Sequence, residues 1–481
     1  MSDLRKKIAD KILPNLKFSA EDLEEKYPKR KLKEGACVTR IAPSPTGFMH
    51  IGNVFSAIIN DRIAHQSDGV MFSRIEDTDQ KRKVEGAVDI IINFLNEFKI
   101  DLDEGEKKDG VETGEYGPYR QSERIEIYQT FLKFLLEKGE AYPCFCSIKD
   151  LEEMSKKQEE EKIRPGYRGE WAVCRNLEHE KIWEMLNNGK PYVIRFKSEG
   201  NFENKIPVKD LVKGDRELSE NDLDIVIQKS DGLPTYHFAH VIDDHLMRTT
   251  HVLRADEWFA SLPIHLQLFG ALGWQAPNYG HISPIQKMDG DSRRKISKRH
   301  DPEASVTYYD EEGYPVDAVI EYLLNLANSD FEDWRKENPK LLNREFQLKI
   351  ERLSGSGALF DFQKLKDVSK EIIAKMTAKE VVEESLKWAR KYDLGLAGQL
   401  ENDKKYSLQI FDIERGGDKS RKDIAKWSDV LYEIGYFFDE IFDSAELYFD
   451  KILSGIDKDD QKLIKDKFLE TYDEKDSKDE W

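Results

Sequence analysis

One segment near the N-terminus constrains the fold more than any other, because it combines an apolar run, a turn rich in proline and glycine, and a helical repeat. Residues 37–42 (CVTRIA) have the composition of a buried strand. Residues 43–47 (PSPTG) contain two prolines and a glycine, which end that strand. The apolar residues that then recur at helical spacing are Phe48, Ile51, Phe55, Ile58, Ile59 and Ile63. A helix that begins just beyond a strand directs its unpaired N–H groups at any ligand bound there, and phosphates fit such a place well.

The same order of elements continues along the chain and predicts an α/β fold. Residues 70–75 have the composition of a second buried strand, and residues 85–98 form an amphipathic helical pattern. Further on, residues 233–244 predict a strand that runs into a loop, residues 250–258 another strand and turn, and residues 261–272 an apolar helix. Alternation of this kind gives a parallel sheet that binds ligands at the carboxyl ends of its strands.

Composition limits the class of protein. The chain of 481 residues is too long for one hydrophobic core. No apolar run approaches the ~20 residues needed to cross a bilayer, and the first residues contain no apolar signal core. Four cysteines point to a reducing compartment, so we expect a cytoplasmic protein without a membrane partner. The net charge of −19 disfavours nucleic-acid binding unless a local basic face is present.

A second motif, residues 295–299 (KISKR), lies far along the chain from the first. A lone histidine or a short basic run is more often structural or solvated than functional. Both motifs in this order, however, are poorly explained by chance. His50 in the first motif and Lys298 in the second are suited to stabilising negative charge on a phosphate.

The two motifs resemble the nucleotide-binding signatures of class I aminoacyl-tRNA synthetases. Residues 40–47 (RIAPSPTG) and 74–79 (RIEDTD) are similar to the glutamyl-tRNA synthetase family, and the resemblance runs from about Val38 to about Trp427. It implies a Rossmann-like, doubly wound parallel-sheet catalytic domain with an α+β insertion, followed by a helical stem-contact region and an all-α anticodon-binding domain. It also implies a monomeric ligase that attaches L-glutamate to the 3′ end of tRNA(Glu), with ATP as substrate.

The expected domain boundaries follow from this resemblance and from changes of pattern along the chain. The domains are a charged helical N-terminal extension at 1–36, the first half of the catalytic domain at 37–117, an acceptor-stem-binding insertion at 118–216, the second half of the catalytic domain at 217–300, a stem-contact region at 301–370 and a helical anticodon-binding domain at 371–481. We expect the extension to be a terminal arm, either packed or frayed. The last domain stops within charged residues, so we expect it to be either reduced or incomplete.

Activation joins the α-carboxylate of glutamate to the α-phosphate of ATP and expels pyrophosphate. The attacking group is already an anion, so the enzyme needs no base and instead positions the reactants and stabilises charge on the phosphate oxygens. The resemblance gives His50 and Lys298 this catalytic role. The residues that it implies for ATP binding are Thr46, Gly47, His50, Gly52, Asn53, Glu257, Trp258, Lys295, Ser297 and Lys298. Asn53 stands where the family often has a histidine. The triphosphate also requires Mg²⁺, held mainly by ATP oxygens and water.

Recognition of glutamate needs a cation for the side-chain carboxylate and an anion for the ammonium group. Arginine suits the first task because its guanidinium binds a carboxylate through two hydrogen bonds. The resemblance places six residues in this pocket: Arg40, Ala42, Ser44, Glu76, Tyr236 and Arg254. Glu76 is the expected partner of the ammonium group. The alternatives are a structural ion pair between Arg40 and Glu76, and a core role for Tyr236.

A possible zinc site lies in the insertion, where some relatives hold the metal with a similar cysteine pattern. Cys144, Cys146 and Cys174 supply three thiolates, and Tyr167 or His179 is the candidate for the fourth ligand. Three thiols without a metal remain the alternative.

Two basic clusters are candidates for RNA contact. They are Arg120, Arg124, Arg164 and Arg168 in the insertion, and Lys419, Arg421, Lys422 and Lys426 in the C-terminal part. Three other functions stay open: an enzyme that also charges tRNA(Gln), a shortened paralogue that glutamylates a modified base, and an inactive RNA-binding paralogue. The presence of His50 and Lys298 together with Arg40 and Glu76 argues against the last of these.

Overall fold

The computed structural model describes residues 2–45, 49–79, 84–417, 420–443 and 456–471. The chain divides into two compact units, Met1–Tyr309 with Val319–Phe362 and Asp310–Ala318 with Gln363–Trp481. In the part of the chain that is described, no helix combines the length and the apolar character needed to span a membrane.

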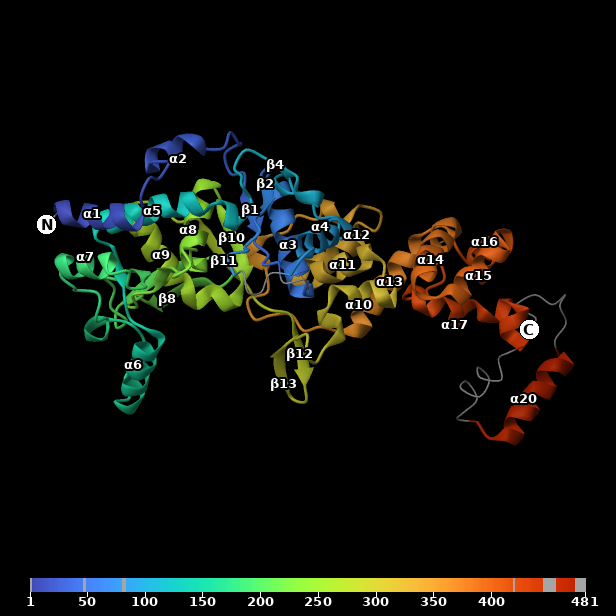
Figure 1. Cartoon of the computed structure of the whole chain (residues 1–481). Helices are drawn as coiled ribbons and strands as arrows, with labels where there is room; N and C mark the ends of the chain where they lie inside the picture. The colour runs from blue at the N-terminus through green and yellow to red at the C-terminus, as the bar shows by residue number, and fades with distance from the viewer. Residues whose placement is uncertain (1, 46–48, 80–83, 418–419, 444–455, 472–481) are drawn as a thin grey trace. The chain divides into compact units, whose positions relative to one another are not determined.

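A parallel sheet forms the centre of the first unit. Strand β1 (Val38–Ile41) pairs in parallel with β2 (Val70–Ser73), and β10 (His251–Ala255) pairs in parallel with β11 (Asn278–Ile282). A backbone hydrogen bond of 3.0 Å joins the residue before β10 to the first residue of β1, so the two pairs lie side by side. The strands therefore follow the order β2-β1-β10-β11, with β1, β10 and β11 adjacent in Figure 1.

Apolar helix faces cover the strands of this sheet. Helix α3 (Ile51–His65) contacts β1, β2 and β10, whereas α5 (Ile125–Lys138) and α9 (Leu262–Ala271) share a hydrophobic core with residues of these strands. Helix α4 (Ala87–Glu97) packs on Ile75, just after β2. Helix α3 is buried along most of its length, as expected for the helix that follows β1. The strand–turn–helix predicted for residues 37–63 is confirmed on its described residues, whereas Phe48 lies outside them.

The prediction of a strand running into a loop at residues 233–244 is wrong, because Tyr236–Leu246 forms helix α8. Phe238, Val241 and Ile242 lie three and four positions apart and are buried in the core, which is a helical spacing. The neighbouring residues His240, Asp243 and Asp244 resemble a polar loop in the sequence. They are buried instead in a network of ion pairs and hydrogen bonds.

The N-terminal arm is packed on the first unit rather than frayed. It contains α1 (Ser2–Ile12) and α2 (Ala20–Lys26), and a capping box formed by Ser19 and Asp22 begins the second helix. Tyr27 is fully buried, and its hydroxyl donates to the Gly117 carbonyl at 2.8 Å.

Smaller sheets and helices make up the rest of the first unit. A mixed region holds β5 (Ala141–Cys144), α6 (Ile148–Glu160), α7 (His179–Asn187), β6 (Val193–Phe196) and β9 (Val226–Gln228), with β6 between β5 and β9 in an antiparallel sheet. The strands β7 (Lys205–Asp210) and β8 (Gly214–Ser219) extend the main sheet beyond β11, and β12 (Gln286–Asp289) pairs with β13 (Ser292–Lys295). Residues 101–117 contain the two-residue strands β3 (Gly105–Glu106) and β4 (Glu112–Thr113), which pair with each other.

Helices follow the last hairpin. They are α10 (Val306–Glu312), α11 (Val316–Ala327), α12 (Asp330–Glu337), α13 (Phe362–Lys375), α14 (Ala378–Tyr392), α15 (Leu394–Asn402), α16 (Lys404–Asp412), α17 (Val430–Ile434), α18 (Asp439–Asp443) and α20 (Lys458–Thr471). Within the second unit, Val381, Phe411 and Trp427 belong to one hydrophobic core. The predicted fold class, mixed α/β with a helical C-terminal part, is confirmed. The finer domain boundaries stay predictions.

Candidate active site

A cavity of about 440 Å³ lies at the carboxyl ends of the parallel strands in the first unit. This is the place where an open α/β sheet binds its ligand. The predicted site residues that line it are Arg40, Ala42, Ser44, His50, Gly52, Asn53, Glu76, Tyr236, Arg254, Glu257, Trp258 and Lys295. Ile296 is the last residue of the KISKR segment that lines the cavity, and Ser297 and Lys298 follow directly after it. Thr46 and Gly47 lie outside the described residues.

His50 is the N-cap residue of α3. Its backbone is extended, and its Nδ1 accepts a hydrogen bond of 2.9 Å from the backbone N–H of Gly52. A Cβ atom at Gly52 would lie 3.0 Å from that Nδ1, so glycine leaves room for the imidazole to turn back over the helix. Because Nδ1 acts as an acceptor, the neutral ring carries its proton on Nε2.

The two sequence motifs meet at His50. Burial is the largest influence on this residue and lowers its pKa, and the positive charges of Lys295 and Lys298 lower it further. A hydrogen bond with the Ile296 backbone acts in the opposite direction. The second motif therefore lies within electrostatic range of the first, as the sequence analysis requires. The Nζ of Lys295 also lies 2.8 Å from Oε2 of Glu257.

Arg40 belongs to a buried ion-pair network. Its Nε lies 3.3 Å from Oδ1 of Asp244, and Nη1 of Arg74 lies 2.7 Å from the same oxygen. Burial opposes ionisation of Asp244, but the two arginines outweigh it and hold the pKa of Asp244 well below its usual range. Arg40 thus pairs with Asp244 rather than with Glu76.

Glu76 is held by Arg74 instead. Nη2 of Arg74 donates to Oε1 of Glu76 at 2.9 Å. Burial nevertheless raises the pKa of Glu76, against the lowering effect of Arg74. A cation that enters the cavity next to Glu76 would therefore favour its ionised form.

Arg254 is buried at the end of β10, and its contacts differ from those of Arg40. Its Nε lies 3.0 Å from Nε2 of His281, and its Nη2 lies 3.1 Å from Nδ1 of His265. Nη1 lies 3.3 Å from the Tyr236 hydroxyl, and Nη2 lies 3.3 Å from the Trp258 carbonyl. Among the described residues, no carboxylate makes an ion pair with this guanidinium. The N–H groups of Arg254 are therefore largely hydrogen-bonded, but its positive charge has no counter-ion among the described residues.

Aromatic rings close one side of the cavity. The rings of Tyr236 and Trp258 have centroids 4.1 Å apart. Tyr236 is partly exposed and lines the cavity, so it is not a plain core residue, and burial raises the pKa of its hydroxyl.

Comparison with known proteins agrees with this geometry. The family profile described as "tRNA synthetases class I (E and Q), catalytic domain" matches residues 36–367. The chain belongs to this family. One similar relative is the glutamate–tRNA ligase of Clostridium beijerinckii, which is 53% identical over 92% of this chain and 80% of the relative. Another is the glutamate–tRNA ligase of Clostridium perfringens strain 13, which is 49% identical over 98% of this chain and 87% of the relative. The crystal structure of a glutamate tRNA ligase from Elizabethkingia meningosepticum CCUG26117 in complex with its amino acid is 30% identical, with a TM-score of 0.70 over 84% of this chain and 80% of that one. The resemblance found in the sequence is confirmed.

Sequence reasoning missed several residues of this class I site. Asp244 on α8 pairs with two arginines, and His281 on β11 contacts Arg254. The helical spacing of Phe238, Val241 and Ile242 was available as a signal for α8, and a helix would have placed Asp244 one turn after His240. No pattern in the sequence points to His281.

The cysteines gather in this synthetase as predicted. The Sγ atoms of Cys144, Cys146 and Cys174 all lie within 4.8 Å of one another. The Tyr167 hydroxyl lies 3.3 Å from Sγ of Cys144 and 3.5 Å from Sγ of Cys146. His179 is not in this group among the described residues. Three thiols this close together could hold zinc, and Tyr167 lies nearer to them than the other predicted fourth ligand, but metal binding stays a prediction.

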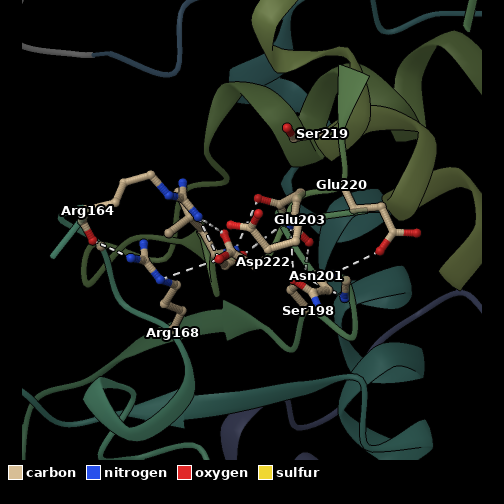
Figure 2. A network of polar contacts seen from close by, with 12 residues as sticks. Arg164, Arg168, Ser198, Asn201, Glu203, Ser219, Glu220 and Asp222 are labelled. Carbon is tan, nitrogen blue, oxygen red and sulfur yellow. Dashed lines mark hydrogen bonds and ion pairs between the residues drawn. The ribbon is translucent and has the colours of Figure 1, made fainter. Parts of the chain in front are cut away.

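The four arginines predicted to contact RNA differ in how exposed they are. Arg124 is fully buried, and its Nε lies 2.6 Å from Oδ1 of Asp243, so its assignment to RNA contact is wrong. Figure 2 shows that Arg164 and Arg168 both reach Asp222, and both keep some exposure. Arg120 pairs with Glu106 and is partly exposed.

In the second unit, carboxylates balance the predicted basic cluster. Arg421 pairs with Asp423, Lys422 with Glu371 and Lys426 with Glu312. Lys422 is the most exposed of these three cations. Lys419 lies outside the described residues. RNA contact by this cluster stays a prediction.

Proposed function

We propose that this chain is a glutamate–tRNA ligase. It activates L-glutamate with ATP to glutamyl-adenylate and transfers the glutamyl group to the 3′ end of tRNA(Glu), releasing AMP and pyrophosphate. The names of its relatives support this activity.

The observation that carries the proposal is the contrast between two buried arginines. Arg40 has the carboxylate of Asp244 as a partner, whereas the described partners of Arg254 are all neutral. A buried charge without a counter-ion is unfavourable, so Arg254 favours a ligand that brings a carboxylate. We therefore assign the side-chain carboxylate of glutamate to Arg254, with Tyr236 beside it.

The other end of the amino acid meets Glu76. Arg74 fixes Oε1 of Glu76, and we assign Oε2 to the α-ammonium group. Arg40, Ala42 and Ser44 line the same cavity and complete the proposed pocket. We assign the α-carboxylate to the side of the cavity where α3 begins.

In the first reaction, an oxygen of the α-carboxylate forms a bond to the α-phosphorus of ATP, and the bond from that phosphorus to the bridging oxygen of pyrophosphate breaks. The N-terminus of α3 and the Nε2–H of His50 are suited to donating hydrogen bonds to the phosphate oxygens. We assign Lys298 and Lys295 to the same negative charge. The other ATP contacts are proposed for Gly52, Asn53, Glu257, Trp258 and Ser297, and Mg²⁺ bound to the phosphates would offset part of their charge.

In the second reaction, a terminal ribose hydroxyl of tRNA attacks the carbonyl carbon of the mixed anhydride, and AMP leaves. We propose that residues 118–216 contact the acceptor stem, with the partly exposed Arg164 and Arg168 among the candidate contacts. Zinc bound by the three cysteines and Tyr167 would hold together the loops that carry them.

Side-by-side charging of purified tRNA(Glu) and tRNA(Gln) with labelled glutamate tests the proposal. We expect label on tRNA(Glu), and periodate oxidation of the 3′-terminal ribose to abolish it. Label on both tRNAs would identify an enzyme that does not discriminate between them. Label that survives periodate would point to a modified base, and RNA binding without any label would point to an inactive paralogue; either result would overturn the proposal.

A further inference from the structure

A three-residue chain stands behind the proposed glutamate pocket. The Nε of Arg254 donates to Nε2 of His281 at 3.0 Å, and Nδ1 of His281 lies 2.6 Å from Oδ2 of Asp210. All three side chains are buried. The cavity touches Arg254, and the other two residues act through it.

The hydrogen bonds fix the protonation of the imidazole. A guanidinium only donates, so Nε2 of His281 has to accept and carries no proton. The proton therefore sits on Nδ1 and is donated to Asp210. Asp210 is itself held, since its Oδ1 accepts backbone N–H groups of Val212, Lys213 and His281. The far end of this three-residue chain is therefore the fixed carboxylate of Asp210, and the imidazole ring of His281 separates it from the guanidinium of Arg254.

Other buried arginines of this unit are treated differently. Arg40 and Arg74 contact Asp244 directly, and Arg124 contacts Asp243. At Arg254 the chain places a neutral ring where those arginines have a carboxylate. A ring in this position orients the guanidinium but leaves its charge for a ligand.

A second imidazole, that of His265, contacts Arg254 at a different guanidinium nitrogen. Nη2 of Arg254 lies 3.1 Å from Nδ1 of His265, whose Nε2 lies 3.0 Å from Nδ1 of His237. Burial lowers the pKa of all three histidines, and for His237 to about 4. These rings are therefore neutral near pH 7.

We propose that His281, oriented by Asp210, is the positioning residue that aims Arg254 at the side-chain carboxylate of glutamate without neutralising its charge. This inference rests on the proposed function, since it takes glutamate as the ligand. In this inference, the imidazole of His281 sets the orientation of Arg254, while the positive charge of Arg254 stays available for the ligand.

Three substitutions at position 281 separate these properties. His281→Gln places an amide oxygen near the position of Nε2, so the KM for glutamate should stay within ~5-fold of wild type. His281→Asn keeps a donor for Asp210 but loses the contact with Arg254, so that KM should rise ~10-fold. His281→Glu places a carboxylate against the guanidinium, so that KM should rise by ~100-fold or more.

The measurement is pyrophosphate exchange into ATP in the presence of tRNA, with KM determined for glutamate and for ATP. We expect the KM for ATP to stay within ~3-fold in every variant, which a general folding defect would not allow. A His281→Glu enzyme with wild-type KM for glutamate, or variants in which both KM values rise together, would overturn the inference. If His281→Glu does not fold, the His281→Asn and His281→Gln pair decides, since equal KM values for glutamate in these two would also overturn it.

The result also distinguishes this inference from the function on which it rests. If the wild-type protein shows no glutamate-dependent exchange, the proposed function is wrong. If the wild-type protein exchanges with glutamate but the position-281 variants leave the KM for glutamate unchanged, only the role of His281 is wrong.

Discussion

Nδ1 of His50 accepts a hydrogen bond of 2.9 Å from the backbone of Gly52, so one ring nitrogen caps helix α3 and the other carries the proton that can be donated. The capping and catalytic roles of this residue can therefore be separated by substitution. Asparagine is a good N-cap but has no donor at the position of Nε2.

We predict that His50→Asn lowers kcat for glutamate activation by ~10²-fold, because a donor to the transition-state charge is lost. The thermal midpoint should stay close to wild type because the cap is kept. His50→Ala should lose both activity and about 1 kcal/mol of stability. Wild-type kcat in His50→Asn would remove His50 from the catalytic machinery.

Arg254→Ala should raise the KM for glutamate by ~100-fold or more, as expected when one partner of a buried charge pair is removed. The KM for ATP should change little, since the nucleotide residues are untouched. Steady-state exchange kinetics at varied glutamate give both values. If the glutamate KM stays normal and that of Arg40→Ala rises instead, the carboxylate is bound by the other arginine.

Lys298 is exposed beyond the cavity wall, so removing it should not disturb the core. We predict that Lys298→Ala lowers kcat by ~10²-fold with a wild-type thermal midpoint. Lys340→Ala removes another exposed cation of the same unit and serves as the matched control. Equal rates in the two variants would show that Lys298 has no part in activation.

The cysteine cluster predicts a metal content. Purified protein should hold about one zinc per chain, and Cys174→Ser should reduce this below ~0.2, because a site with three thiolates and a phenol depends on each ligand. Cys37→Ser is the control, since Cys37 lies outside the cluster. Metal analysis of wild-type protein that finds less than ~0.2 zinc per chain would leave the three thiols without a metal.

His65 should make stability depend on pH. Its Nδ1 lies 3.1 Å from Oδ1 of Asp61 and its Nε2 lies 3.1 Å from Oδ2 of Asp103. The hydrogen bond to Asp61 is the main cause that raises the pKa of His65 to about 9, against the effect of burial. A pKa raised in the folded state gives stability that is complete below the unfolded value of about 6.5 and is lost as pH rises to 9.

His65→Gln should therefore lower the free energy of unfolding most at pH 6, by about 1–3 kcal/mol, and the difference from wild type should shrink by pH 9. His300→Gln changes an exposed histidine and serves as the control. A His65→Gln difference that is the same at pH 6 and pH 9 would show that the ring is not charged in the folded protein.

The sequence was most informative where structure is decided locally. The prolines and glycine after β1 and the apolar spacing of α3 lie within a few turns of each other, and the structure contains the elements that they predict. Helix α8 was missed because its buried aspartates and histidines resemble a loop. They are buried because arginines from other elements neutralise the aspartates, and that pairing is not visible in a local window.

The same reasoning applies to the site. Arg40 and Arg254 could be predicted from a resemblance, whereas the partners that set their charge state could not. Asp210 reaches His281 only because β7 and β11 are neighbours in the sheet, although the two residues are 71 positions apart. Arg124 was misassigned for a related reason: a sequence shows a positive charge but not its burial beside Asp243, 119 positions away.

Exchange of labelled pyrophosphate into ATP in the presence of tRNA, measured with glutamate, glutamine and aspartate in turn, shows whether Arg254 selects a side-chain carboxylate. We expect exchange with glutamate alone, because Arg254 requires a carboxylate and the pocket holds it at a fixed distance from Glu76. Exchange supported equally by glutamine, whose side chain carries no charge, would contradict it.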